Sequence, residues 1–151
     1  MTKEPSPLYT VFIGGNMTEL VVRAAVEELN TVLEFVQEQL DRYECGIKEA
    51  MRIQIAVEEI FVNIANYAYE CETGTAKIQV TYIEDISSIR ITMIDSGKQY
   101  NPLLKEDPDI TLSAEERPIG GLGIFMVKKT MDKVDYEYKD GQNCLTITTT
   151  I

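Results

Sequence analysis

Two polar residues four positions apart, Glu59 and Asn63, lie in a mainly apolar stretch of the chain. In an α-helix this spacing places both side chains on one flank, one turn apart. An amide oxygen can bind a hard cation such as Mg²⁺, and a carboxylate one turn away can orient an attacking hydroxyl group. The pair is therefore suited to metal–nucleotide chemistry, although in isolation a solvated polar flank is the more common interpretation.

Asp95 stands at the exit of a β-branched apolar segment and is followed by Ser96 and Gly97. Glycine lets the backbone turn sharply at this point. An aspartate at such a turn can accept a hydrogen bond from an exocyclic amine, which would read adenine. For the motif alone, a turn or capping role is the more common interpretation.

The segment Gly120-Gly121-Leu122-Gly123 precedes a short helical pattern. The free N–H groups and the positive dipole end of a helix N-terminus favour phosphate. The segment is not a P-loop, because no Gly-Lys-[Ser/Thr] follows, and it lacks the GxGxxG spacing of dinucleotide-binding folds. By itself it is a weak indication of phosphate binding.

The apolar spacing predicts three helical regions that position these residues. The first begins at Thr18 as its N-cap and extends to Leu40, as one helix or as two with a break near Asn30. The second, over 47–69, carries Glu59 and Asn63. The third, over 122–131, follows the glycine-rich segment.

Five strands are predicted from period-2 patterns. They cover residues 8–13, 77–83, 88–94, 134–138 and 144–150, with turns at Gly14-Gly15-Asn16 and Asp140-Gly141. Residues 98–119 carry three prolines and many charges, which predicts a long loop. The order of elements favours an α+β fold. We expect a single domain over 1–151, a two-layer sandwich whose mixed, mainly antiparallel sheet is covered on one face by helices.

Composition narrows the function classes. The formal net charge of −11 opposes a nucleic-acid partner, which needs a basic footprint. The three cysteines lack metal-site spacing and are typical of reduced thiols in the cytoplasm, where we expect the protein. No apolar run is long enough for a membrane span. Because the chain contains no histidine, imidazole-based catalysis is excluded and a carboxylate is the expected general base.

Together, and in this order, the three motifs resemble those of the GHKL ATPase superfamily, which includes gyrase, the ninety-kilodalton heat-shock chaperones and histidine kinases. The matching segments are Glu59-Ile60-Phe61-Val62-Asn63 for the N box, Asp95-Ser96-Gly97 for the G1 box and Gly121-Leu122-Gly123 for the G2 box. More narrowly, segments 95–102 and 120–127 look like those of bacterial anti-sigma factor serine/threonine kinases. The resemblance extends from the first helix to the end of the chain.

This resemblance implies a GHKL-type, histidine-kinase-like fold that binds ATP and Mg²⁺. Glu59 falls on the family's catalytic glutamate, Asn63 on its Mg²⁺-binding asparagine and Asp95 on its adenine-binding aspartate. Residues 98–119 correspond to the ATP lid. The other nucleotide-binding residues that we infer are Asn66, Gly97, Lys98, Gly120, Gly121, Leu122 and Gly123.

Two departures from the family pattern bear on catalysis. Tyr67-Ala68 stands where many family kinases have His-Gly, and Arg117 is the candidate, at a looser spacing, for an arginine that meets the γ-phosphate. The leading hypothesis is a cytoplasmic serine/threonine kinase and anti-sigma factor that phosphorylates a small antagonist protein and binds a sigma factor. A homodimer through the first helix and strand is expected from the same resemblance. The alternatives are an ATP-dependent partner-switching module without turnover and a stand-alone histidine-kinase-like ATPase domain.

Overall fold

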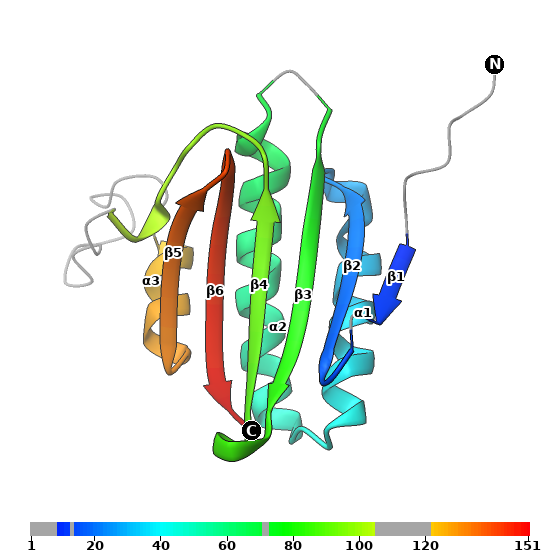
Figure 1. Cartoon of the computed structure of the whole chain (residues 1–151). Helices are drawn as coiled ribbons and strands as arrows, with labels where there is room; N and C mark the ends of the chain where they lie inside the picture. Colours follow the sequence, from blue (N-terminus) through cyan, green and yellow to red (C-terminus); the bar gives the residue numbers. More distant parts are fainter. Residues whose placement is uncertain (1–8, 13, 71–72, 105–121) are drawn as a thin grey trace.

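One antiparallel sheet organises the computed structural model, which describes residues 9–12, 14–70, 73–104 and 122–151 (Figure 1). Within these residues the strands are β1 (Tyr9–Phe12), β2 (Met17–Arg23), β3 (Thr75–Ile83), β4 (Ser88–Asp95), β5 (Lys133–Lys139) and β6 (Gln142–Thr150). Their order across the sheet is β1-β2-β3-β4-β6-β5. Every adjacent pair is antiparallel, so the described strands contain none of the parallel pairs that a mixed sheet would have.

Three α-helices cover one face of this sheet (Figure 1). They are α1 (Leu29–Arg42), α2 (Ile47–Asn63) and α3 (Leu122–Thr130), and α2 continues into a π-helical turn over Ile64–Ala68. The predicted helix over 47–69 is therefore confirmed in extent, with its last turn wound more widely. The two-layer α+β sandwich predicted from the sequence is also confirmed.

The core lies between the sheet and α1 and α2. Apolar residues that recur every three or four positions on α2 meet the inward-facing alternate residues of β3, β4 and β6. Members of this cluster that are at most 4% exposed include Val32, Phe35, Ile53, Val57, Phe61, Ile78, Ile91, Met93 and Ile147. Burying each such side chain contributes about 1.5–3 kcal/mol, and the burial fixes which flank of α2 remains accessible.

The prediction that a helix begins at Thr18 is wrong, because residues 17–23 form β2. Gly14 and Gly15 adopt positive φ angles of 90° and 57°, which turns the chain back on itself directly after β1. Thr18 pairs with Val80 of β3, and its side chain is buried. The apolar residues of this segment have near-helical spacing, which the interpretation followed. Its β-branched residues are instead stabilised in a strand that pairs with a neighbour on each side.

The turn between β5 and β6 occurs where the sequence predicts it. Asp140 and Gly141 have φ angles of 53° and 76°, as a two-residue hairpin turn requires. This hairpin sets the register of β5 against β6, and β6 in turn pairs with β4 so that Asn143 lies directly opposite Asp95. The last residue of β4 and the first residues of β6 therefore lie side by side at one end of these two interior strands.

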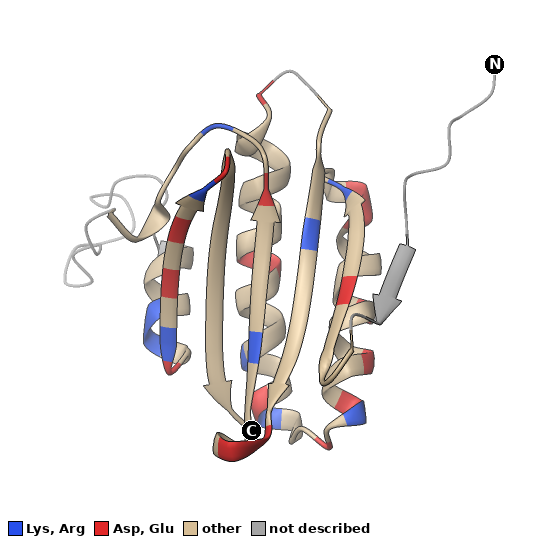
Figure 2. Cartoon of the chain, in the orientation of Figure 1, with Lys and Arg blue, Asp and Glu red and all other residues tan. Residues whose placement is uncertain are grey.

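The charged residues of the described segments are dispersed over strands and helices (Figure 2). Along its exposed side β5 carries two acidic residues, Asp135 and Glu137, between two basic residues, Lys133 and Lys139. Of the helices that the structure describes, none is long and apolar enough to cross a membrane. Cys45 and Cys144 are free thiols, and Cys71 lies outside the described residues.

Candidate functional site

Glu59 and Asn63 occupy the same flank of α2, as their spacing predicts. The Asn63 Nδ2 donates a hydrogen bond of 3.2 Å to Oε1 of Glu59. This bond leaves the amide oxygen of Asn63 with no hydrogen bond from the described residues. A carbonyl oxygen oriented in this way is a suitable ligand for Mg²⁺.

Gly123, at the start of α3, lies against Glu59 of α2. A Cβ atom built on Gly123 would overlap the carboxyl group of Glu59. The beginning of α3 therefore touches the catalytic candidate on α2 directly. Because backbone N–H groups at a helix N-terminus attract anions, a phosphate group at this point would lie beside both Glu59 and Asn63.

Asp95 ends β4 as a buried carboxylate that is 6% exposed. Its Oδ1 accepts two hydrogen bonds of 2.9 Å, from the backbone N–H of Gly97 and from Nδ2 of Asn143. Its Oδ2 receives none from the described residues. One carboxylate oxygen is therefore held by the protein, and the other is available as an acceptor for an exocyclic amine.

The turn after Asp95 is attached to the end of the helix that carries Glu59. A Cβ atom at Gly97 would overlap the backbone carbonyl of Ala68, so only glycine permits this approach. The backbone N–H of Lys98 donates to the same carbonyl at 2.8 Å. Ala68 lies nine residues after Glu59, which corresponds to about 13 Å along a helix. An extended nucleoside triphosphate can bridge the two ends of this span.

Tyr69 also holds the turn that follows Asp95. Its hydroxyl accepts the backbone N–H of Ser96 at 2.7 Å and donates to the carbonyl of Thr75 at 2.6 Å. Burial is the largest cause that raises the pKa of Tyr69 above its ordinary value. The neutral hydroxyl therefore joins α2, β3 and the exit of β4 across neutral pH.

Asn143 belongs to the site but was not predicted from the sequence. It is 6% exposed and forms hydrogen bonds to the Asp95 carboxylate, to the Lys98 carbonyl and to Tyr100. A signal does exist in the sequence, because Asn143 is a polar residue in the inward-facing row that continues with Leu145 and Ile147. That row could be recognised only once the facing strand was known.

Other predicted site residues lie outside the described residues or, within them, have no side-chain hydrogen bond to Glu59, Asn63 or Asp95. Gly120, Gly121 and Arg117, and most of the predicted lid over 98–119, lie outside the described residues. Leu122 begins α3 as predicted. Asn66 is exposed in the π-helical turn, with no hydrogen bond described for its side chain. The Lys98 ammonium lies 3.9 Å from Glu70, and both side chains are well exposed.

The described residues fit a Mg²⁺–nucleotide complex better than a resident metal ion. They contain no group of three His, Cys, Asp or Glu side chains that could hold a metal. Mg²⁺ commonly takes one or two protein ligands, with phosphate oxygens and water completing its shell. The amide oxygen of Asn63, next to an anion-favouring helix N-terminus, is such a partial donor set.

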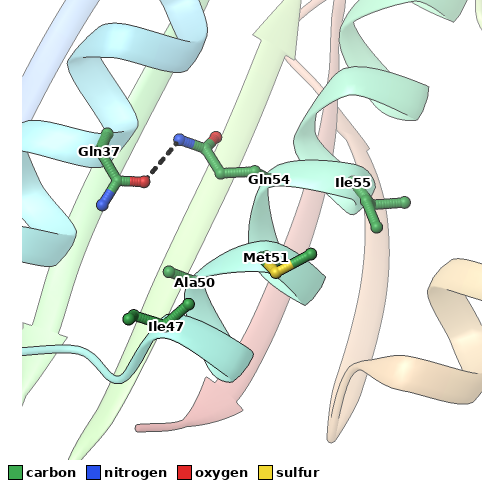
Figure 3. A pocket seen from close by; sticks show the side chains of 6 residues that line it. All are labelled: Gln37, Ile47, Ala50, Met51, Gln54 and Ile55. Carbon is green, nitrogen blue, oxygen red and sulfur yellow. Dashed lines mark hydrogen bonds between the residues drawn. The ribbon is translucent and has the colours of Figure 1, made fainter.

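A groove of about 320 Å³ lies elsewhere, between α1 and α2 (Figure 3). Gln37 and Gln54 face each other across it with a hydrogen bond of 3.3 Å. Its other lining residues are Ile47, Ala50, Met51 and Ile55. Because this lining carries no ionisable group, the groove offers none of the chemistry expected of the predicted site.

Comparisons with known proteins agree with the predicted family. Serine/threonine-protein kinase BtrW of Bordetella bronchiseptica is 24% identical over 108 residues, which cover 72% of this chain and 74% of that protein. Serine-protein kinase RsbW of Listeria monocytogenes is 29% identical over 94 residues, 59% of each protein. RsbW of Bacillus mycoides is 29% identical over 97 residues, which cover 62% of this chain and 59% of that protein. The chain thus spans about three fifths of the RsbW relatives.

A solved structure shares the fold. The crystal structure of the RsbU and RsbW domains of a Mycobacterium tuberculosis protein matches with a TM-score of 0.60 and 17% identity, over 87% of this chain and 32% of that one. The family model described as a histidine kinase-like ATPase domain matches residues 22–149. This match covers most of the chain and includes Glu59, Asn63, Asp95 and the glycines at 120–123. The chain therefore belongs to the family of histidine kinase-like ATPase domains.

Proposed function

We propose that this protein is a cytoplasmic Mg·ATP-dependent protein kinase that transfers the γ-phosphoryl group to a serine or threonine hydroxyl of a small partner protein. The observation that carries the proposal is the contact between Glu59 of α2 and Gly123 of α3. It places a carboxylate at a phosphate-favouring helix N-terminus, one turn from the amide of Asn63.

In this reaction the hydroxyl oxygen of the partner forms a bond to the γ-phosphorus while the bond from that phosphorus to the bridging oxygen breaks, and ADP leaves. Glu59 receives the hydroxyl proton. Gly123 and the other N–H groups at the start of α3 hold the phosphates, and Asn63 orients the metal. Mg²⁺, when bound, neutralises charge on the phosphate oxygens. The contribution of the chain is thus positioning and electrostatic stabilisation.

The adenine end of the nucleotide is proposed to meet Asp95. Its free Oδ2 can accept the 6-amino group of adenine, whereas guanine would present a carbonyl oxygen to it. Two facing acceptors in a buried site are unfavourable. The pocket should therefore prefer ATP to GTP, with Gly97 and Lys98 forming the adjacent turn and residues 98–119 serving as the lid.

The biological role that we propose is that of an anti-sigma factor. In this role the partner that receives phosphate is a small antagonist protein, and a second partner is a sigma factor. The support is the resemblance of segments 95–102 and 120–127 to such kinases, together with relatives named serine-protein kinases. The protein is proposed to act as a single domain and as a homodimer.

A switching module without turnover is a second candidate, and one observation favours it. The adenine half of the site, around Asp95 and Gly97, is built from described residues with fully specified hydrogen bonds. Tyr67-Ala68 stands where many family kinases have His-Gly, which favours a loss of transfer. A protein that keeps only the adenine half of the function would bind nucleotide and change its partner affinity without transfer.

Labelled phosphate separates these two functions. The purified chain is incubated with γ-labelled ATP, Mg²⁺ and extract from its native cell, beside Glu59→Gln as the matched control. Label on serine or threonine of a small protein, dependent on the chain and lost with Glu59→Gln, supports the kinase. Protein that co-purifies in ATP but not in ADP, without any transfer of label, supports the switch.

A further inference from the structure

Asn143 is a buried amide at the edge of the sandwich where β4 ends and β6 begins. It lies directly opposite Asp95 in the strand register and is 6% exposed. The next residues in its inward-facing row, Leu145 and Ile147, are apolar and pack into the core. A buried polar side chain in such a row is costly unless its hydrogen bonds are satisfied.

The hydrogen bonds of Asn143 fix the orientation of its amide. Nδ2 donates at 2.9 Å to Oδ1 of Asp95 and at 2.9 Å to the carbonyl oxygen of Lys98. Oδ1 accepts the backbone N–H of Tyr100 at 3.1 Å and the hydroxyl of Tyr136. Both donors and both lone pairs of the amide are therefore used. Rotation of the amide by half a turn would face donors with donors and acceptors with acceptors.

This fixed amide determines what the Asp95 carboxylate can do. Oδ1 of Asp95 already accepts the Gly97 N–H, so the Asn143 donor is its second protein partner. Oδ1 is thereby held as an acceptor, and Oδ2 is the oxygen left for a ligand. The same amide also anchors the chain at Lys98 and Tyr100, immediately after the turn.

We infer that Asn143 is a positioning and specificity residue: it directs Oδ2 of Asp95 toward the adenine amine and ties that carboxylate to the first residues of the following segment at Lys98 and Tyr100. This role rests on the proposed ATP-binding function. Asn143 touches no nucleotide itself and acts through Asp95. The Nδ2 donor of Asn143 requires an acceptor at Asp95, so the Asp95 carboxylate stays an acceptor. In this way the orientation of the Asn143 amide sets the preference for a nucleotide base that carries an amino group.

Asn143→Asp tests this role because it preserves the shape of the side chain and replaces the Nδ2 donor of Asn143 by an acceptor oxygen. In the variant, a carboxylate oxygen faces the Asp95 carboxylate and the Lys98 carbonyl with no proton between them. The pair recovers a hydrogen bond when it takes up a proton. We therefore expect ATP affinity at pH 8 to fall roughly ten- to hundredfold below wild type. At pH 5.5 the deficit should narrow by roughly tenfold.

The expectation takes account of the other ionisable groups near Asn143 and Asp95. They are Tyr136 on β5, Tyr100 and Lys98 in the segment after β4, Tyr69 at the end of α2, and Cys144 on β6. Burial is the largest cause that raises the pKa of Tyr69, Tyr136 and Cys144, and the Asp95 charge is among the others. These groups are therefore neutral between pH 5.5 and 8. The Lys98 ammonium is exposed and lies 3.9 Å from Glu70.

Gln142→Glu is the matched control, since it makes the same amide-to-carboxylate change at the neighbouring residue. Gln142 donates a 3.4 Å hydrogen bond to the Ser96 hydroxyl, which can donate to a glutamate instead. This control should bind ATP like wild type at both pH values. Using affinity ratios to wild type removes the pH dependence of the nucleotide itself.

Tyr136→Phe is a second variant, which removes one donor to Asn143 from the edge strand β5. Its ATP affinity should fall about two- to tenfold, as expected for one lost hydrogen bond. This measurement decides the question if Asn143→Asp does not fold at pH 8, as judged by circular dichroism.

The measurement is calorimetric titration with Mg·ATP, with folding checked at each pH. Wild-type affinity in Asn143→Asp at pH 8, an equal deficit at both pH values, or unchanged affinity in Tyr136→Phe would each overturn the positioning role. Absence of ATP binding by the wild-type chain would instead overturn the proposed function, and with it this role.

Discussion

The carboxyl group of Glu59 rests directly on the backbone of Gly123, so that no side chain fits at residue 123 without displacing it. Glu59 lies on α2 and Gly123 at the start of α3, and the two residues are 64 positions apart in the sequence. The contact joins the carboxylate that we assign to proton transfer with the helix end that we assign to the phosphates.

Gly123→Ala should therefore impair transfer more than folding. The added methyl group meets the flexible end of Glu59, which can rotate away, so the fold should tolerate it. A carboxylate displaced by about 1 Å can cost on the order of 10²-fold in rate. Single-turnover transfer and thermal unfolding measure the two effects. Gly46→Ala is the control. Gly46 is the residue before α2, its added methyl group would meet the flexible end of the Glu49 side chain, and this variant should leave transfer unchanged.

Glu59→Gln and Asn63→Ala should fail in different ways. Asn63→Ala removes a Mg²⁺ ligand from the ground state and the transition state alike, which should weaken Mg·ATP binding. Glu59→Gln retains a hydrogen-bond acceptor for Asn63 but cannot accept the proton. It should bind ATP like wild type and lose transfer by on the order of 10²–10⁴-fold. ATP titration beside single-turnover transfer tests both variants, and an intact transfer rate in Glu59→Gln would remove its catalytic role.

Asp95→Asn should nearly abolish ATP binding while leaving the protein folded. The amide oxygen of the variant can still accept from Gly97 and Asn143, but its NH₂ group replaces the acceptor for adenine. A hydrogen bond to a charged group contributes about 1.5–3 kcal/mol, or roughly ten- to a hundredfold in affinity. Calorimetric titration checks this result, and an unchanged dissociation constant would exclude Asp95 from the site.

Tyr69→Phe should destabilise the junction between α2, β3 and β4. It leaves the Ser96 N–H and the Thr75 carbonyl without their described partner, at a cost of about 1 kcal/mol because water reaches both groups. Urea unfolding at pH 8 measures the loss. Tyr67→Phe is the control, because Tyr67 is 70% exposed in the preceding turn.

The same variant also predicts a pH dependence. Burial raises the pKa of Tyr69, so the folded protein holds its proton more tightly than the unfolded chain. That stabilisation is complete below the ordinary tyrosine pKa of about 10 and is lost as the pH rises through the folded value. Wild-type stability should thus fall above pH 10, and Tyr69→Phe should fall less steeply. Parallel curves for the two proteins would contradict this.

Local patterns in the sequence were sufficient to predict most of the elements and the two halves of the candidate site. The spacing of Glu59 and Asn63 fixed their shared flank because helical periodicity is a property of neighbouring residues. Asp140 and Gly141 predicted their hairpin for the same reason, since only a few residue types adopt positive φ angles. The buried side of α2 could likewise be read from its apolar spacing.

Only the tertiary structure decided how distant segments meet. Residues 17–23 became β2 because β1 and β3 pair with them on both sides, which no local pattern reports. Asn143 joined the site because β6 places it opposite Asp95, 48 residues away. Gly97 required glycine because Ala68 approaches it from another element. Pairing and close approach depend on long-range packing, and they therefore remain undetermined until the sheet is assembled.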